Sequence, residues 1–222
     1  MHELKFGLTA EAQCNYLPQQ QEQLVFLLPQ QPVDAVLYQQ LLQLNFRRSG
    51  EQVYTPYCKA CRACQSVRIN PATAKYSRSQ RRILNRADNN AWHYQLTDTP
   101  SVDYFPLFSD YINHKHNDGS MYPPSRDQLD VMMHCSWLKV CFLEQYYQQQ
   151  LVAVTVVDET NNAYSAVYTF FHHSAAEFSP GILAILYLLQ CTARDSKQWL
   201  YLGYQIDSCQ KMAYKAGFLP QQ

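Results

Sequence analysis

The 222-residue sequence lacks any run of the roughly 18 apolar residues that a helix needs to cross a bilayer. Residues 1–10 contain charges and no long apolar core, so they do not resemble a secretory signal. Nothing therefore marks the eight cysteines for an oxidising compartment. We expect a cytoplasmic protein that does not enter a membrane and whose thiols are reduced.

The sequence also lacks the patterns that are typical of duplex DNA binding and of coenzyme A binding. The chain has no helix-turn-helix or zinc-finger pattern, so we expect no sequence-specific binding of duplex DNA. It also lacks the Arg/Gln-x-x-Gly-x-Gly loop that cradles the pyrophosphate of coenzyme A, which ranks a coenzyme A acyltransferase low. A hydrophobic content of 47% excludes a disordered chain and is enough for one large domain or two modest ones.

Net charge is absent as well, because eighteen Lys and Arg residues balance eighteen Asp and Glu residues. The charges are nevertheless unevenly placed. Residues 47–86 hold ten of the eighteen basic residues and a single acid, Glu51, which leaves eight bases and seventeen acids elsewhere. Such a segment favours a docking surface for a polyanion, and the alternative is a solvated basic face without a partner.

Arginines are densest at the end of this segment, in the expected helix 79–87. Arg78, Arg81, Arg82 and Arg86 fall within nine residues there. Guanidinium groups bind phosphates in a bidentate manner, and the nearby Tyr76 offers a ring on which an unpaired base can stack. This pattern predicts binding to a nucleic-acid backbone.

Three cysteines, Cys58, Cys61 and Cys64, share a Cys-x-x-Cys-x-x-Cys loop in the same basic segment. This spacing lets a loop wrap one soft metal ion, and Cys14 is the natural fourth ligand because it lies in the same half of the chain. Spacing alone does not separate zinc from an iron–sulfur cluster. Unliganded thiols packed in a loop are an equally weighted alternative.

Apolar periodicity and turn residues predict an α+β fold. A helix that begins at Pro32 should end near Asn45. A capping box at Ser125 and Gln128 should open another helix. The remaining expected helices are 104–112 and 182–193, and the expected strands are 24–28, 53–54, 67–69, 140–146, 151–157, 164–171 and 199–204.

The polar stretch 86–100 has turn residues and no sustained apolar period, so it serves as the expected boundary between domains 1–88 and 89–222. In the second domain, the step from strand 164–171 through Ser179-Pro180-Gly181 into an apolar helix is similar to an acyltransferase donor site. Plain core packing is the favoured alternative. The polar loop 207–215 directly follows a strand and is a further candidate site.

Eight segments occur together in the order that is found in aminoacyl-tRNA–protein transferases of the N-degron pathway, and most closely in the bacterial leucyltransferase branch. These segments are 14–18, 46–50, 57–64, 77–82, 123–128, 165–171, 201–204 and 211–215. The chain resembles this family from about residue 14 to its end. It departs from the usual family pattern at Gln205, near Gly217 and after Pro220.

The resemblance implies an N-terminal cysteine-containing domain joined to a GNAT-like acyltransferase domain. It also implies transfer of leucine from leucyl-tRNA to the N-terminal Asp or Glu of a protein, which marks that protein for proteolysis and requires no cofactor. Arginyl transfer from arginyl-tRNA is one alternative. A non-catalytic, metal-containing RNA-binding module is another.

Within this reaction, four residues are candidates for orienting the amine and stabilising the developing oxyanion, namely Tyr168, Asp207, Lys211 and Tyr214. Six basic residues are candidates for binding the tRNA acceptor end or the substrate's acidic side chain, namely Arg47, Arg48, Arg78, Arg81, Arg82 and Lys215.

Overall fold

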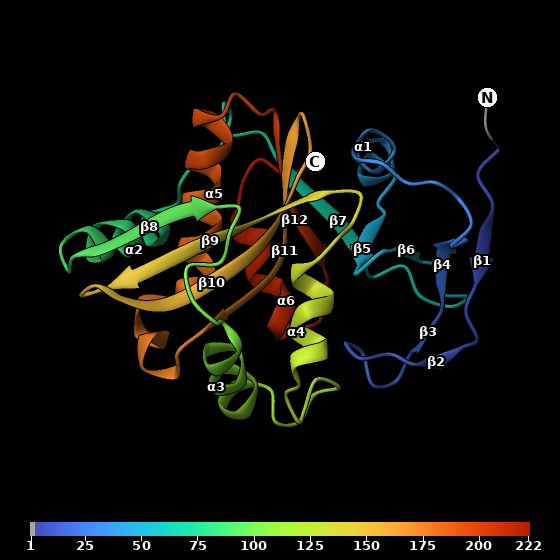
Figure 1. Ribbon diagram of the computed structural model, residues 1–222, viewed down its shortest axis with the longest axis horizontal. Coiled ribbons are helices and arrows are strands. Elements are labelled where there is room, and N and C mark those ends of the chain that lie inside the picture. Colours follow the sequence, from blue (N-terminus) through green and yellow to red (C-terminus); the bar gives the residue numbers. More distant parts are fainter. Residues whose placement is uncertain (1–2) are drawn as a thin grey trace.

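A computed structural model describes residues 3–222 as two main sheets joined by a continuous core (Figure 1). The sheet at the right of Figure 1 has four strands and one helix, and the larger sheet at the left has six strands with helices on both faces. Within residues 3–222, no helix is both long enough and apolar enough to span a membrane. The α+β class is confirmed.

The four-stranded sheet is antiparallel and has the order β1-β4-β6-β5. Its strands are β1 (Phe6–Leu8), β4 (Leu24–Leu27), β5 (Arg47–Ser49) and β6 (Gln52–Pro56), and a small hairpin pairs β2 (Ala12–Gln13) with β3 (Gln21–Glu22). Helix α1 (Ala35–Gln43) begins at Asp34, whose carboxylate accepts a hydrogen bond of 2.7 Å from the Leu37 N–H. The expectation that this helix includes Pro32 is wrong, because Asp34 caps it two residues later.

The six-stranded sheet has the order β7-β12-β11-β10-β9-β8. Its strands are β7 (Gln65–Ile69), β8 (Trp92–Thr97), β9 (Lys139–Tyr147), β10 (Gln150–Glu159), β11 (Ala163–Phe171) and β12 (Trp199–Gln205). The expected antiparallel meander is confirmed as β9, β10 and β11. The polar stretch 86–100 is not only a linker, because it contains the edge strand β8.

Helices cover both faces of this sheet. Helices α2 (Arg78–Asp88) and α5 (Pro180–Arg194) pack on one face, and α3 (Phe105–Lys115) and α4 (Arg126–Met133) pack on the other. Alternation along β9 explains the two cores, since Leu143 belongs to the first and its neighbour Phe142 to the second. The predicted capping box of Ser125 and Gln128 is present at the start of α4.

Strands β11 and β12 pair in parallel only over Ala163–Ser165 and Trp199–Tyr201. Beyond this point β11 continues along β10 to Phe171, and β12 continues along β7 to Gln205. The two strands therefore separate after Ser165 and Tyr201. The segments α6 (Gln210–Ala213) and η2 (Tyr214–Gly217), which follow β12, contact its end.

The two sheets meet in a shared core that joins residues of α1 and β6 with Ala163, Trp199 and Tyr201. A buried polar contact crosses the same boundary. Arg48 of β5 donates from Nε to Oδ1 of Asp158 on β10 at 2.7 Å, and Tyr38 of α1 donates to Oδ2 at 2.9 Å. Both charged side chains are fully buried. Strand β7 also crosses over, since it follows the cysteine loop but pairs with β12. The division into domains 1–88 and 89–222 remains a prediction.

We expect Arg48→Met to lower the free energy of unfolding by about 3–5 kcal/mol, because it leaves the buried Asp158 carboxylate without its cation. The double variant Arg48→Met/Asp158→Asn removes that charge but keeps an acceptor for Tyr38. It should recover a large part of the loss in urea unfolding measured at neutral pH. Strictly additive losses in the double variant would contradict this account.

Candidate functional site

The candidate site lies where β11 and β12 separate, around the ring of Tyr201. Arg47 of β5 places its guanidinium carbon 5.1 Å from the centroid of this ring and 5.5 Å from that of Tyr204. Ser165 is the backbone partner of Tyr201 on β11. Among residues 3–222, the buried side-chain polar atoms without a hydrogen-bond partner are Arg47 Nε and Ser165 Oγ. Both lie beside Tyr201, so a polar group that binds at this point would supply the hydrogen bonds that these two atoms lack.

Arg47 is a buried cation that no carboxylate pairs with directly. Its guanidinium donates to the Phe46 carbonyl at 2.6 Å, to the Leu42 carbonyl at 3.4 Å and to the Ser66 hydroxyl. Within the described residues it has no ion-pair partner within 4.0 Å. Burial lowers the pKa of Arg47, although neighbouring tyrosines partly oppose this effect.

Lys215 is a second buried cation close to the first. Its Nζ donates a hydrogen bond of 2.7 Å to the Tyr204 carbonyl. Burial, and then the charge of Arg47, lower the pKa of Lys215 to about 8. Gly203 lies beside this amine, and its φ of +79° is the reason for a glycine there, because an added Cβ would lie 3.6 Å from Nζ, an ordinary contact.

The charges in this region do not cancel. Burial alone would lower the pKa of Arg48, but Asp158 more than offsets that effect and raises it. Asp158 is the carboxylate that faces both arginines, and it contacts Arg48 directly. Arg47, Arg48 and Asp158 together carry a formal charge of +1, and the nearby Lys215 adds one more positive charge when it is protonated. We refer to Arg47 and Lys215 below as the buried cation pair.

Tyrosines border the site along β11 and α3. Tyr168, a predicted catalytic residue, is half-buried on β11, and its ring centroid lies 6.2 Å from that of Tyr111 on α3. Burial raises the pKa of Tyr168, and the nearby hydroxyls of Tyr111 and Tyr16 add to this effect. These phenols therefore stay protonated and can donate hydrogen bonds. Tyr214, also predicted, is 43% exposed and lies near Tyr111.

Two other predicted catalytic residues, Asp207 and Lys211, are exposed on the segment after β12. Asp207 accepts a hydrogen bond of 2.6 Å from the Gln205 amide. Lys211 lies 3.5 Å from an Asp118 carboxylate oxygen. Neither is held in the buried part of the site, so their catalytic roles remain predictions.

The predicted basic residues separate into two groups. Arg78, Arg81 and Arg82 are exposed on α2 and have no ion-pair partner within the described residues, whereas Arg86 pairs with Glu177. Arg47 and Arg48 are only 6% and 4% exposed. Neither guanidinium therefore lies on the solvent-facing surface, and the predicted role of these residues in binding the tRNA end or the substrate's acidic side chain remains a prediction. Their guanidiniums point into the protein, and Arg48 is already occupied by Asp158.

The four predicted metal-binding cysteines, Cys14, Cys58, Cys61 and Cys64, lie near one another but do not form a closed site. Burial raises the pKa of Cys64 to about 11, and the other three thiols add to this effect. Within residues 3–222, no three of these sulfur atoms lie within 4.8 Å of one another. Binding of a metal by these four cysteines remains a prediction.

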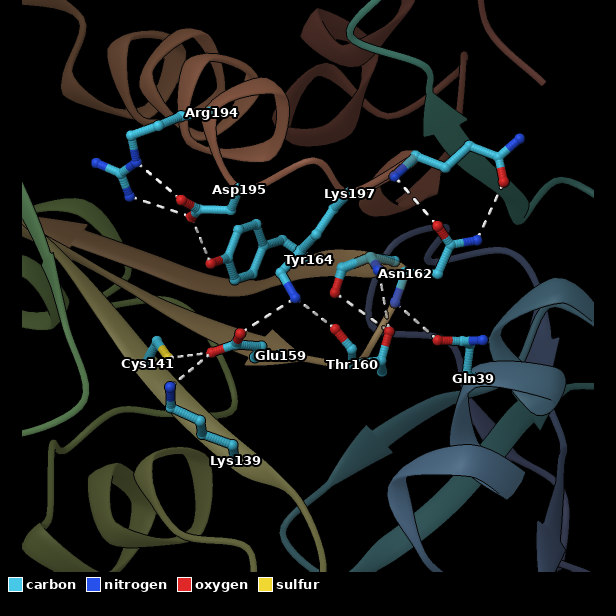
Figure 2. A network of polar contacts seen from close by, with 12 residues as sticks. Gln39, Lys139, Cys141, Glu159, Thr160, Asn162, Tyr164, Arg194, Asp195 and Lys197 are labelled. Atoms are coloured by element: carbon cyan, nitrogen blue, oxygen red, sulfur yellow. Dashed lines mark hydrogen bonds and ion pairs between the residues drawn. The ribbon is translucent and has the colours of Figure 1, made fainter.

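A separate polar hollow of about 480 Å³ lies at the start of β11 (Figure 2). Its charges pair internally, with Glu159 between Lys139 and Lys197 and with Asp195 beside Arg194. Burial and a hydrogen bond to Glu159 raise the pKa of Cys141 to about 12, which makes it a poor nucleophile. This network stabilises the end of the sheet and does not offer free reactive groups.

Sequence reasoning missed Tyr111, Ser165 and Asp158. Tyr111 was assigned only to an apolar helix face, and nothing local distinguishes its ring from core aromatics. Asp158 near the end of a strongly apolar strand was an available signal, because a carboxylate that directly follows such an apolar run and is buried with it needs a cation.

Comparison with known proteins identifies the class to which this fold and site belong. Residues 103–222 match the family described as "Arginine-tRNA-protein transferase, C terminus", and residues 12–82 match "Arginine-tRNA-protein transferase, N terminus". The chain belongs to the arginine-tRNA-protein transferase family and is an aminoacyltransferase. The resemblance that was noted in the sequence is confirmed.

Among relatives, the chain is similar to proteins named aspartate/glutamate leucyltransferase. It is 42% identical to one from Aeromonas hydrophila over 99% of this chain and 91% of the relative. It is 43% identical to one from Pseudoalteromonas atlantica over 99% of this chain and 94% of the relative. These matches extend across both sheets.

Solved structures share the fold at low sequence identity. L-PGS from Bacillus licheniformis has a TM-score of 0.52 at 13% identity and covers 65% of this chain and 47% of its own. The C-terminal DUF2156 domain of a protein from Agrobacterium fabrum has a TM-score of 0.51 at 11% identity and covers 77% of this chain and 52% of its own. At such identities the likeness concerns the fold alone.

The lowered pKa of Lys215 predicts a specific pH dependence of stability. The folded pKa of about 8 lies below the usual value of 10.5, so the protonated lysine destabilises the fold, and stability rises as pH increases from about 8 toward 10. Between about pH 7.5 and about pH 9.5, the unfolding free energy of the wild type should rise by about 2 kcal/mol relative to Lys215→Met. A constant difference between the two proteins in urea unfolding would show that Lys215 titrates normally.

Proposed function

We propose that this protein transfers leucine from leucyl-tRNA to the N-terminal Asp or Glu of acceptor proteins and thereby marks them for N-degron proteolysis. The names of its relatives support this substrate assignment. The supporting observation in the fold is the buried cation pair. An acidic side chain that enters beside Tyr201 would supply the anion that Arg47 and Lys215 lack.

The acidic group fits this location better than a phosphate of the tRNA backbone. Arg47 and Lys215 are 6% and 7% exposed, so only a small group on a flexible chain can reach them. A carboxylate on the first residue of a protein meets that condition. Arg47, whose Nε is free, and Lys215 would donate hydrogen bonds to the two carboxylate oxygens. An amide in place of the carboxylate would leave both charges uncompensated.

The chemistry needs alignment more than strong acid–base groups. The leucyl ester is already activated, and an N-terminal amine with a pKa of roughly 7.7–8.0 is partly neutral at cellular pH. The amine nitrogen attacks the ester carbonyl, the carbon–nitrogen bond forms, and the bond to the ribose oxygen breaks. The proton that the nitrogen loses ends on that oxygen. Holding the two reactants together supplies most of the acceleration.

Tyr168 is suited to the oxyanion that develops in this step. Its raised pKa keeps the hydroxyl protonated, and a donor that is already in place costs no reorganisation during the reaction. Tyr111 and Tyr16 border the same position and restrict it to a narrow ester. Tyr214, Asp207 and Lys211 would act from the exposed side, where they orient the acceptor chain.

The tRNA body would lie along α2. Arg78, Arg81 and Arg82 form an exposed row without internal partners, which is the arrangement that phosphate contacts require. The six-stranded sheet, whose neighbouring parallel strands separate at the site, supports a GNAT-like architecture for this half. Charged tRNA is a cytoplasmic substrate, so we place the protein there and assign it no DNA partner.

A transfer assay with two donors and paired acceptors tests the proposal. Leucyl-tRNA or arginyl-tRNA, each labelled on the amino acid, is incubated with peptides that begin with Asp, Glu, Asn or Gln. We expect leucine on the Asp and Glu peptides and little on their amides. Label from arginyl-tRNA alone would establish the arginyl donor instead. Tight tRNA binding without any transfer would favour a binding module.

Lys215→Met should reduce the preference for Asp over Asn by at least about tenfold in kcat/KM, or about 1.4 kcal/mol, because one of the two cations is lost. Lys5→Met is the matched control, since it removes an exposed lysine to which no role in the site is assigned. An unchanged preference in Lys215→Met, with Lys5→Met also unchanged, would show that the buried cation pair does not recognise the acidic side chain.

Arg81→Ala/Arg82→Ala should weaken tRNA binding and lower the slope of log K against log salt by about 1.4 to 1.8, as expected for two lost phosphate contacts. Lys5→Ala/Lys115→Ala removes the same charge from exposed positions outside α2 and should leave most of the slope intact. Filter binding across a salt series measures both. Equal slopes for the two double variants would contradict the assignment to α2.

A further inference from the structure

Four polar side chains gather on the side of α3 that faces the end of β11, away from the buried cation pair. Asp110 and His114 lie one turn apart on α3, and His172 and His173 follow β11 directly. The strand and the helix therefore bring together residues about 60 positions apart in the sequence. The transferase reaction proposed above uses none of them.

The distances within this cluster are short. Oδ1 of Asp110 lies 3.2 Å from Nδ1 of His114 and 3.0 Å from Nδ1 of His173. The ligand atoms of Asp110, His114 and His173 all lie within 4.8 Å of one another. Ligands about 2.0–2.2 Å from a zinc ion in tetrahedral geometry would lie roughly 3.3–3.5 Å apart, so the two nitrogens would move slightly away from Asp110 Oδ1 when an ion replaces the hydrogen-bonded protons between them.

The protein holds these groups in orientation even without an ion. The His173 main-chain N–H donates to Asp110 Oδ2 at 2.9 Å, which ties the carboxylate to the end of β11. The rings of His114 and His173 stack with centroids 4.2 Å apart and an angle of 20° between their planes. Because an ion lies in the plane of each imidazole that binds it, one of these exposed rings would turn when the ion binds.

Two imidazole nitrogens and one carboxylate oxygen are a donor set that suits zinc and neighbouring transition metals better than calcium or magnesium. A fourth position is open to water or to His172, whose Nε2 lies 4.0 Å from Asp110 Oδ1. The main-chain hydrogen bond to Asp110 is the kind of outer contact that orients a metal ligand.

We propose that Asp110, His114 and His173 bind one divalent transition-metal ion, with Zn²⁺ as the best match. The ion braces α3 against the end of β11. Tyr111 follows Asp110 directly on α3, and Tyr168 on β11 lies four residues before His172. The ion would therefore fix the helix and the strand from which these two rings meet. Its role is structural, and it does not take part in the acyl transfer.

Calorimetric titration of the chelator-treated full chain with Zn²⁺ tests this site. The expected result is one ion per chain at this cluster and a rise in melting temperature with the ion present. Asp110→Asn and His173→Ala should each weaken binding by more than about tenfold, because even the loss of a group that only orients a ligand costs about 10- to 100-fold. Circular dichroism checks that each variant is folded.

His134→Ala is the matched control. Like His114, His134 is an exposed histidine whose Nδ1 contacts the carbonyl of an aspartate four residues earlier, Asp130. It has no second imidazole beside it among the described residues. This variant should bind Zn²⁺ as the wild type does. Equal losses in His134→Ala and His173→Ala would overturn the proposal, since they would indicate unspecific surface binding.

The cysteines require a second control, because thiolates also bind Zn²⁺. The triple variant Cys58→Ser/Cys61→Ser/Cys64→Ser should keep the ion at Asp110, His114 and His173. Co²⁺ serves as the spectroscopic probe, and the cluster should give visible absorption without a thiolate charge-transfer band. Binding that disappears with the three cysteines, or that is unchanged in Asp110→Asn, would also overturn the proposal.

Discussion

The contact between Arg48, Asp158 and Tyr38 is the constraint on which the site depends. It joins β5 and α1 of the small sheet to β10 of the large one inside a continuous apolar core. Because a buried carboxylate must keep its cation, the two sheets have essentially one way to meet. Arg47 is the neighbour of Arg48 on the same strand, so its side chain is directed to the opposite side, toward Tyr201. The pairing of one arginine thus determines where the next one points.

The basic residues of the segment 47–86 consequently have two different tasks. On α2, Arg78, Arg81 and Arg82 are exposed and have no ion-pair partner among the described residues, as a surface for phosphates requires, whereas Arg86 pairs with Glu177. On β5 they are buried, and one is neutralised while the other is not. The proposed transfer of an amino acid from a large polyanion to the end of a protein needs both arrangements, since long-range attraction brings the tRNA and a small enclosed charge selects the acceptor. Counting basic residues along the sequence does not separate these two roles, because it does not show which residues are exposed.

Much of the fold could be predicted from the sequence because its signals are local. The capping box of Ser125, the meander 139–171 and the apolar helix after Pro180 were each recognisable from a few consecutive residues. Strand β8 was missed because Trp92–Thr97 is half polar and lies at a sheet edge, where one face is exposed. The crossing of β7 into the large sheet was also not predictable, since strand pairing depends on distant residues.

The site was predicted less completely for the same reason. Lys215 and Tyr168 could be named as candidates from the sequence, but whether Arg47 and Arg48 are exposed depends on how α1 and β10 close over them. The histidine cluster was overlooked since its ligands lie on α3 and after β11, with no compact spacing. Residue type indicated the available chemistry, and packing decided which of these groups remain free to use it.

Gly203 shows what this packing demands of later change in the sequence. Its φ of +79° is a backbone conformation that glycine adopts freely and other residues rarely do, and the Lys215 amine lies against this stretch, bonded to the Tyr204 carbonyl. A Cβ at residue 203 would make an ordinary contact with the amine, so strain of the backbone rather than lack of space opposes a side chain there. Sequences that keep Lys215 in place would therefore be expected to keep glycine at residue 203.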